Sequence, residues 1–267
     1  MIKPLMTPIP YLGNKRRELI HISEYEPTVY NKVVDVFGGS GSISLYYLNK
    51  GCIVHYNDKI KAIVGFYDIL KDEKRVPELI EAIKSIPNTD DEYKRLHPLA
   101  LKTLTENKDP DLKMISEYLW CFISTGSCLF PSYFKNLRND NYYANKAKAW
   151  LKFPPVVKDL KTTSLDYKEL FELYKDDTQA FLILDPPYFS STCIPYAKCS
   201  IDVYDDILHM LENAKCSLML IVEFTGYTYH KFKDYIKHTY TKRYSVRGTK
   251  NKYKIASQKY HSIITNY

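Results

Sequence analysis

Short apolar runs alternate with helical segments at the beginning of the chain. The run VVDVF at Val33–Phe37 ends in glycines and predicts a buried strand, and CIVHY at Cys52–Tyr56 predicts a second one. Between and after them, the polar and apolar spacing predicts helices over Ser42–Lys50 and Lys59–Leu70. This strand–helix–strand–helix order is typical of the start of a parallel α/β sheet.

The pattern changes between about Lys71 and Pro155. Three helices are predicted there, and an aromatic and polar stretch at Gly126–Ala144 predicts a loop or hairpin. We interpret this block as a module inserted into the sheet domain. The helices of the block are expected at Val76–Ile86, Glu92–Thr105 and Asp111–Ser124.

The α/β rhythm resumes after the inserted block. Helices are predicted at Tyr167–Tyr174, Ile201–Asn213 and Tyr229–His238. Strands are predicted at Phe181–Leu184, Ser217–Phe224, Thr241–Val246 and Tyr260–Thr265.

Composition narrows the class of protein. The chain has 267 residues, 45% of them apolar and 26% charged, which fits one globular domain with an insertion and excludes a disordered or collagen-like chain. The six cysteines form no CxxC pair and no histidines cluster at ligand spacing, so we expect reduced thiols and no metal site. The apolar runs are too short to cross a membrane and the N-terminus has no signal-peptide core, so no membrane association is expected. These features predict a cytoplasmic protein, and they leave open whether the cell is a bacterial cell or a virus-infected host cell.

Positive charge and tyrosine are unevenly distributed. The net charge is +7, and Tyr229–His261 holds ten Lys and Arg against one acidic residue, while Ser132–Lys152 holds five against one. With 25 tyrosines, this composition suits a nucleic-acid partner, because phosphates attract basic stripes and bases stack on aromatic rings. Solvated surface segments and a biased composition explain the same numbers equally well.

A glycine-rich turn separates the first predicted strand from its helix. The sequence Phe37-Gly-Gly-Ser-Gly41 permits a tight turn close to a ligand, and Asp58 ends the next strand, where a carboxylate can accept ribose hydroxyls. Because Ser44 stands in place of a third glycine, the fingerprint of dinucleotide enzymes is incomplete. Strand, turn, helix, strand and acid in this register favour an adenosine-containing cofactor.

The tetrapeptide Asp185-Pro186-Pro187-Tyr188 directly follows a predicted strand. Two prolines fix the backbone and remove two N–H donors, so the turn presents acceptors suited to an amino group, beside a flat ring on which a base can stack. A plain strand-ending turn is the alternative, and the cofactor turn elsewhere in the chain makes it the weaker one.

Taken together, these motifs resemble the DNA adenine-N6 methyltransferases of the Dam type. Tyr11-Leu-Gly-Asn-Lys15 is similar to the family's N-terminal motif, DVFGGSG at Asp35–Gly41 to its cofactor motif, and Asn57-Asp58 to the end of its second strand. DPPY matches the catalytic motif, and IITNY at Ile263–Tyr267 is similar to the closing strand. The hairpin region Leu129–Asn141 is poorer in Gly and Asn than in relatives, and His261 stands where relatives often carry an acidic residue.

The resemblance implies an α/β fold in which a Rossmann-like methyltransferase sheet carries an inserted, mostly helical target-recognition domain. Residues 1–65 and 156–267 would form the catalytic domain that binds S-adenosylmethionine, and residues 66–155 the recognition domain. The enzyme would transfer the cofactor's methyl group to N6 of an adenine flipped out of double-stranded DNA.

Individual site residues follow from the same resemblance. Asp185, Pro186, Pro187 and Tyr188 would be catalytic, with Asp185 accepting hydrogen bonds from the amine and Tyr188 stacking on the base. The residues that would contact S-adenosylmethionine are Tyr11, Lys15, Asp35, Phe37, Gly39, Gly41, Asp58, Asp166 and Asp185. The DNA-binding candidates are Lys135, Asn136, Arg138 and Asn139, with Tyr133 or Phe134 as a wedge in the base stack.

Other readings remain open from sequence. The incomplete glycine fingerprint disfavours an oxidoreductase. The acidic first residue of DPPY disfavours an enzyme that methylates RNA or a protein amide. A methyltransferase fold that only binds DNA is disfavoured by its complete motifs. No Pro-Cys pair occurs, which argues against cytosine C5 chemistry. The DNA site and the presence of a restriction endonuclease partner are left open.

The basic segments predict DNA binding that weakens steeply with salt. Each lost phosphate contact should lower the log–log salt slope by about 0.9. If Arg138 reads a base, Arg138→Ala should change site preference more than general affinity, as measured by titrations on several duplex sequences. A uniform loss on all sequences would instead make Arg138 a phosphate contact.

Overall fold

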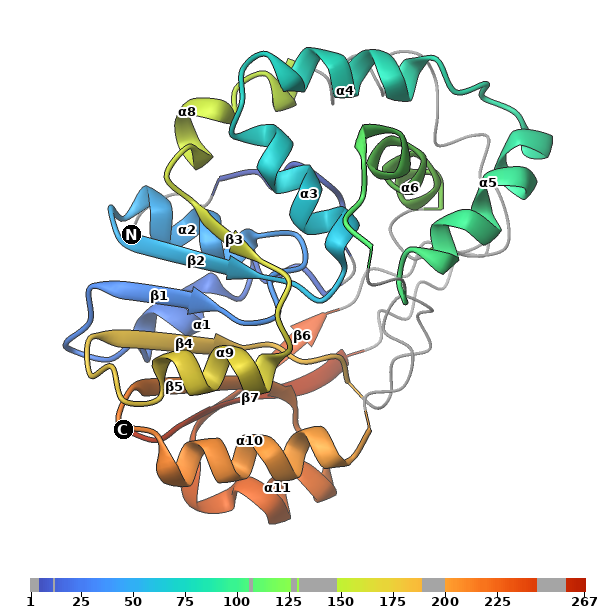
Figure 1. Cartoon of the computed structure of the whole chain (residues 1–267). Helices are drawn as coiled ribbons and strands as arrows, with labels where there is room; N and C mark the ends of the chain where they lie inside the picture. The colour runs from blue at the N-terminus through green and yellow to red at the C-terminus, as the bar shows by residue number, and fades with distance from the viewer. Residues whose placement is uncertain are drawn as a thin grey trace.

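A single mixed sheet organises the protein (Figure 1). The computed structural model describes residues 5–11, 13–105, 108–125, 129, 148–188, 200–243 and 258–267. Within these residues, seven strands form one sheet in the order β3-β2-β1-β4-β5-β7-β6. The strands are β1 (Lys32–Asp35), β2 (Ile53–Asn57), β3 (Lys161–Thr163), β4 (Ala180–Leu184), β5 (Ser217–Glu223), β6 (Ile236–Arg243) and β7 (Gln258–Thr265).

The strand directions place three chain turns at one edge. β1 is parallel to both β2 and β4, and β4 is parallel to β5, whereas β7 runs antiparallel between β5 and β6. Carboxyl ends of parallel strands meet at the same edge of a sheet, and ligands of open α/β sheets bind there. The segments that follow β1, β2 and β4 therefore converge.

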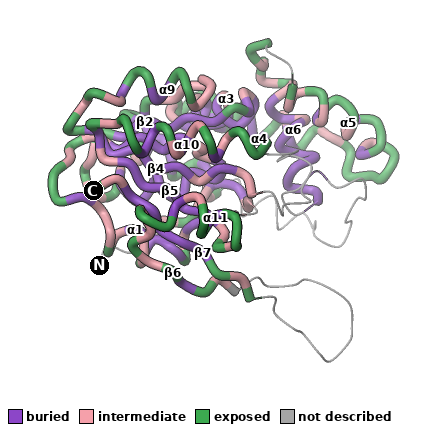
Figure 2. The backbone as a smooth tube through the Cα atoms, turned by 90° about the horizontal axis from the view of Figure 1, so that it is seen from below, coloured by how far each residue is buried: buried purple, intermediate pink, exposed green. Residues whose placement is uncertain are grey.

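Both faces of the sheet are covered, as alternation along parallel strands requires. Val33 and Phe181 face one core, which also receives α1, α2 and α3, while Val34 and Leu182 face a second core beneath α9, α10 and α11. Figure 2 shows buried residues along the central strands and exposed ones on the outer helices. The helices are α1 (Leu19–Glu24), α2 (Ser42–Asn49), α3 (Lys61–Leu70), α4 (Arg75–Lys84), α5 (Asp90–Lys102), α6 (Leu112–Ser124), α8 (Pro154–Val157), α9 (Tyr167–Tyr174), α10 (Asp202–Asn213) and α11 (Gly226–Phe232), with a 3-10 turn at Lys233–Tyr235.

The predicted fold class is confirmed, since the mostly parallel sheet is consistent with a Rossmann-like methyltransferase fold. One boundary between a helix and a strand was wrongly predicted. The helix expected over Tyr229–His238 begins earlier, because Thr225 and Thr228 form a capping box, and it ends at Phe232. Residues from Ile236 onward pair with β7 instead, so the strand expected at Thr241–Val246 begins five residues earlier.

Helices α4, α5 and α6 occupy the predicted inserted block and gather on one side of the sheet (Figure 1). Their apolar residues, such as Leu79, Leu96 and Leu119, share one core with α2 and α3. That residues 66–155 form a target-recognition domain remains a prediction. None of the helices in the described ranges is long and apolar enough to cross a membrane.

Asn57, at the end of β2, ties three strand ends together. Its amide nitrogen donates to the carbonyls of Val36 and Leu165 at 3.0 and 3.1 Å, and its oxygen accepts from Leu165 N–H and the Thr163 hydroxyl, both at 2.8 Å. Asn57 is 1% exposed, so water cannot take over these hydrogen bonds if the side chain is removed. Asn57 thereby fixes where the segments after β1 and β3 leave the sheet.

We expect Asn57→Ala to lower the free energy of unfolding by about 3 kcal/mol, because each buried polar group left without a partner costs about 1–3 kcal/mol. Denaturant titration followed by circular dichroism measures the change. Asn213→Ala, which removes exposed hydrogen bonds on α10, is the matched control and should stay near wild type. Equal stability of the two variants would contradict the role assigned to Asn57.

Candidate active site

Backbone conformation makes glycine necessary in the turn after β1. Gly39 has φ +50° and Gly41 has φ +69°, values that other residues adopt only with strain. Gly41 is also the N-cap of α2, so the helix begins directly at the turn. Because these glycines have no side chain, neighbouring groups can pack directly against the backbone of the turn.

Three tyrosine rings enclose this turn. A Cβ added at Gly38 would overlap the Tyr56 ring, and one at Gly39 would lie 2.9 Å from the Tyr11 ring. The hydroxyl of Tyr56 donates to the Gly39 carbonyl at 2.9 Å, and that of Tyr67 donates to the Ser40 carbonyl at 2.5 Å. The rings hold the turn in one conformation.

Asp58 lies against the same turn. Its carboxylate accepts from the N–H groups of Gly39 and Ile60, both at 2.8 Å, and the residue is 7% exposed. Burial raises the pKa of the Asp58 carboxyl to about 6, and the two N–H donors oppose that rise. Each oxygen has accepted only one of these bonds, so the carboxylate retains lone pairs for a ligand hydroxyl.

Asp35, predicted as a cofactor contact, faces the protein interior. It accepts from the N–H and hydroxyl of Ser44 at 3.1 and 2.7 Å, which anchors the first turn of α2. Burial raises the pKa of the Asp35 carboxyl to about 7 against these hydrogen bonds. A direct contact of Asp35 with a cofactor remains a prediction.

Two further predicted residues lie at the junction with α9. The Phe37 ring packs on Tyr167 with centroids 5.7 Å apart. Asp166 is the N-cap of α9, where it accepts from the Lys168 N–H, and it lies 3.6 Å from the exposed Lys59 ammonium. Its contact with a cofactor adenine remains a prediction.

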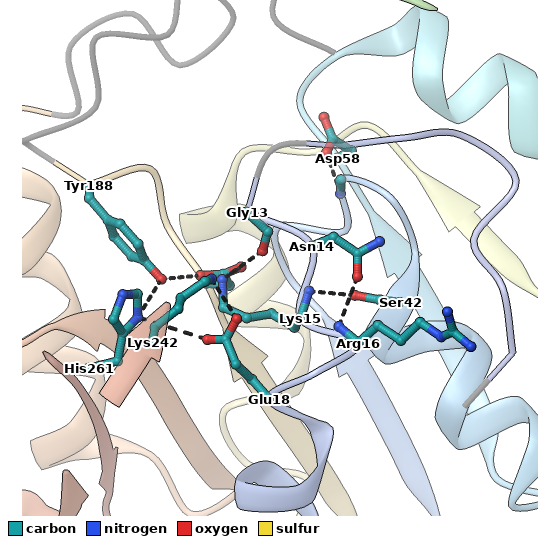
Figure 3. Close-up of polar contacts among 12 residues, drawn as sticks. Gly13, Asn14, Lys15, Arg16, Glu18, Ser42, Asp58, Tyr188, Lys242 and His261 are labelled. Atoms are coloured by element: carbon teal, nitrogen blue, oxygen red, sulfur yellow. Dashed lines mark hydrogen bonds and ion pairs between the residues drawn. The ribbon is translucent and has the colours of Figure 1, made fainter. Parts of the chain in front are cut away.

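The N-terminal segment reaches across the turn to the DPPY motif. The Lys15 N–H donates to the Ser42 hydroxyl at 3.1 Å, and its ammonium lies 2.5 Å from Asp185 Oδ2 and 3.0 Å from the Gly13 carbonyl (Figure 3). Tyr11, from the same segment, packs against Phe122 of α6. Lys15 thus links segments that are far apart in the sequence.

Asp185 follows β4 directly, and both its oxygens have partners. Lys15 holds Oδ2, while the Tyr188 hydroxyl donates to Oδ1 at 3.0 Å. Lys15 also lies 5.4 Å from the centre of the Tyr188 ring, in a cation–π contact. Pro186 is buried and Pro187 half-buried, so the turn is fixed between these side chains.

Four residues that sequence reasoning did not place complete the site. The Glu18 carboxylate lies 2.5 Å from the Lys242 ammonium and accepts from the Tyr240 hydroxyl at 2.7 Å. His261 of β7 lies 3.9 Å from Glu18 and 3.4 Å from the Tyr188 hydroxyl (Figure 3). Glu18 stands three positions after Lys15, which is the one local signal for it. Nothing local points to Lys242 or Tyr240.

Lys15 and Glu18 keep their charges despite burial, with exposures of 2% and 4%. Burial lowers the pKa of Lys15, but Asp185 and Glu18 outweigh it and raise the pKa above its usual value. For Glu18, burial is outweighed by Lys15 and Lys242, which lower the pKa. The charges of Asp185, Lys15, Glu18 and Lys242 therefore alternate in sign across a mostly buried region.

The structure brings Tyr11, Lys15, Gly39, Asp58 and Asp185 to one edge of the sheet. Asp166 and Phe37 lie at its border. The candidates Lys135, Asn136, Arg138 and Asn139, with Tyr133 and Phe134, lie outside the described residues. Among the described residues, no group of His, Cys, Asp and Glu is arranged to hold a metal ion.

A comparison with protein families matches residues 11–246 to the family described as D12 class N6 adenine-specific DNA methyltransferase. The match includes the glycine turn, Asp58 and the DPPY motif, and it ends before β7. A comparison with curated proteins finds no match.

Proposed function

The chain belongs to the D12 class of N6 adenine-specific DNA methyltransferases, and we propose that it moves a methyl group from S-adenosylmethionine to N6 of an adenine flipped out of double-stranded DNA. The observation that carries this proposal is Asp185, held by Lys15 at the carboxyl end of β4 and beside the glycine turn. An acceptor for the amine and a cradle for the methyl donor then share one edge of the sheet.

The charge of the site fits S-adenosylmethionine. The site contains four buried or half-buried carboxyls (Glu18, Asp35, Asp58 and Asp185) and two ammonium groups, of which Lys15 pairs with Asp185 and Lys242 with Glu18. A surplus of acid favours a sulfonium cation over the pyrophosphate of a dinucleotide. The Gly39 N–H, which a pyrophosphate would need, already donates to Asp58. These features favour the methyl donor over the oxidoreductase alternative.

Residues of the turn would hold the cofactor. The positive φ angles of Gly39 and Gly41 set the course of the turn. Asp58 has lone pairs for ribose hydroxyls, and Tyr11 and Lys15 lie beside the turn. When bound, S-adenosylmethionine supplies a methyl group that a nucleophilic nitrogen can attack. The protein supplies position and electrostatic environment.

Asp185 would act on the amine of the target base. That amine is conjugated with the adenine ring and weakly nucleophilic. A carboxylate that accepts one of its N–H bonds favours a pyramidal nitrogen whose lone pair faces the methyl group. Lys15 keeps the carboxylate ionised until the amine arrives, and burial, which raises the pKa of Asp185, makes the same group a better acceptor of the departing proton.

Duplex DNA is the proposed substrate, and the target adenine would stack on Tyr188 once flipped. Recognition of the DNA site would fall to residues 66–155, where Lys135, Asn136, Arg138 and Asn139 remain the candidates. Methyl transfer from labelled cofactor, offered DNA, RNA and protein side by side, tests the substrate class. Transfer to RNA or protein alone would overturn the proposal.

Cofactor affinity should depend on Asp58 and on pH. Asp58→Ala should weaken binding by roughly 1.5–3 kcal/mol, the worth of a hydrogen bond to a charged group. Because burial raises the pKa of Asp58 to about 6, its carboxylate is present above that pH, and affinity should fall as pH drops through it. Calorimetry from pH 5 to 8 measures both effects. In Asp58→Asn, the loss of cofactor affinity near pH 6 should disappear. Unchanged cofactor affinity in Asp58→Ala would contradict the role of Asp58 in cofactor binding.

Methyl transfer should depend on Asp185. Losing one preorganised transition-state contact costs about 10²–10³ in rate, so Asp185→Ala should lose at least that much. Asp185→Asn should lose less, because its amide oxygen still accepts one hydrogen bond. Single-turnover rates with saturating cofactor and DNA measure the loss.

Asp177→Ala is the matched control for this prediction. It removes a half-exposed ion pair with Lys32, at the opposite end of β4 from the site, and should keep the wild-type rate. A folded Asp185→Ala protein that binds cofactor and still methylates DNA within tenfold of wild type would contradict the mechanism.

A further inference from the structure

His261 brings a ring nitrogen of β7 to the DPPY turn. The side chain is fully buried, and Nδ1 lies 3.4 Å from the Tyr188 hydroxyl (Figure 3). The two rings meet edge to face, with centroids 5.2 Å apart at 74°. His261 therefore contacts Tyr188 through both its ring and its nitrogen.

The hydrogen bonds of Tyr188 determine which nitrogen of His261 carries the proton. The Tyr188 hydroxyl has one proton and donates it to Asp185 Oδ1 at 3.0 Å. Toward His261 the same hydroxyl must accept, so Nδ1 is the N–H donor. Glu18 Oε2, 3.9 Å from Nδ1, favours the same tautomer because it faces the positive end of that N–H bond.

The surrounding charges keep the imidazole neutral. Burial and the Lys242 ammonium lower the pKa of His261 to about 3, against the opposing effect of Glu18. Lys15 and Lys259 act in the same direction as Lys242. A neutral imidazole has only one N–H group, and here that group is Nδ1–H, which points toward the Tyr188 hydroxyl.

We propose that His261 is a positioning residue for the target adenine: its Nδ1–H holds the Tyr188 hydroxyl and thereby fixes the ring on which the base stacks. The inference rests on the proposed function. His261 acts through Tyr188 and not on the reacting atoms.

The Tyr188 ring would be held from two sides. Its hydroxyl lies between Asp185 and His261, and its face lies beneath the Lys15 ammonium. The incoming amine must share Asp185 with that hydroxyl, so His261 is the partner that Tyr188 retains throughout. A ring already in place loses less conformational freedom when a base stacks on it. Loss of the His261 contact should therefore weaken base binding more than the chemical step.

A purely structural role for His261 makes a different prediction. The ring also packs 5.8 Å from Tyr240, so its loss disturbs the core whether or not Tyr188 has a hydroxyl. A positioning role acts only through that hydroxyl. The two roles separate in a double-mutant cycle, because only residues that act through one another give non-additive effects.

The cycle combines His261→Leu with Tyr188→Phe. Labelled S-adenosylmethionine and unmethylated duplex DNA of mixed sequence serve as substrates, and KM for DNA, kcat and cofactor affinity are measured. His261→Leu should raise KM for DNA roughly tenfold with kcat and cofactor affinity nearly unchanged. His261→Asn, whose amide N–H takes the place of Nδ1–H, should restore most of the loss.

In the Tyr188→Phe background, His261→Leu should have no further effect on KM. Ser262→Ala, which removes a hydroxyl contact with Thr239 on the same strand, is the control and should resemble wild type. Additive effects of His261→Leu and Tyr188→Phe, or no rescue by His261→Asn, would overturn the positioning role.

Nitrogen-15 NMR of the imidazole keeps this inference separate from the proposed function. His261 should show a protonated Nδ1 at pH 7, and Tyr188→Phe should shift that signal. If the wild-type chain methylates nothing, the proposed function fails while the contact is still tested. A protonated Nε2 with an unprotonated Nδ1 would overturn the inference in either case.

Discussion

The ion pair between Lys15 and Asp185 holds the N-terminal segment, the glycine turn and the DPPY motif together. It connects the N-terminal segment to the end of β4, and the Lys15 backbone is held in turn by Ser42 at the start of α2. Removing one partner of a buried pair typically costs about 3–5 kcal/mol, because the other charge is left without compensation. The glycine turn and the DPPY motif are therefore placed relative to one another by a contact that tolerates little displacement.

Two buried charges of this kind need further partners, and the fold supplies them from its antiparallel edge. Glu18 lies between the ammonium groups of Lys15 and Lys242 and offsets both charges. Through Lys242 and His261, β6 and β7 therefore contribute to a site whose glycine turn and DPPY motif lie on other elements. The position of β7 between β5 and β6 therefore bears on the site as well as on the fold. It places His261 and Lys242 beside the turn after β4.

Sequence reasoning succeeded where a local signal existed. Apolar runs marked β1, β2, β4 and β5. Short motifs singled out Lys15, Asp58 and Asp185, which the fold brings to one edge of the sheet, and their roles remain predictions. It failed where partners come from far away: β3 is the polar run Lys161–Thr163, which is a strand because it pairs with β2. Glu18 and Tyr240 meet across 222 positions, with no spacing rule to connect them. The end of α11 was misplaced for the same reason, since pairing with β7 decides where β6 begins.

The abundance of tyrosine acquires a different meaning in the folded chain. Composition alone allowed these residues to be stacking surfaces for nucleic acid, yet Tyr56 and Tyr67 are fully buried and bond the carbonyls of the glycine turn. A phenol suits this position because its ring fills the space that the glycines leave, while its hydroxyl satisfies a carbonyl that no water reaches. Tyr188 differs in being half-buried and bonded to side chains of the DPPY site. The same residue type thus supports the glycine turn in one place and, in the proposed function, would offer a ring to the substrate in another, and burial distinguishes the two positions.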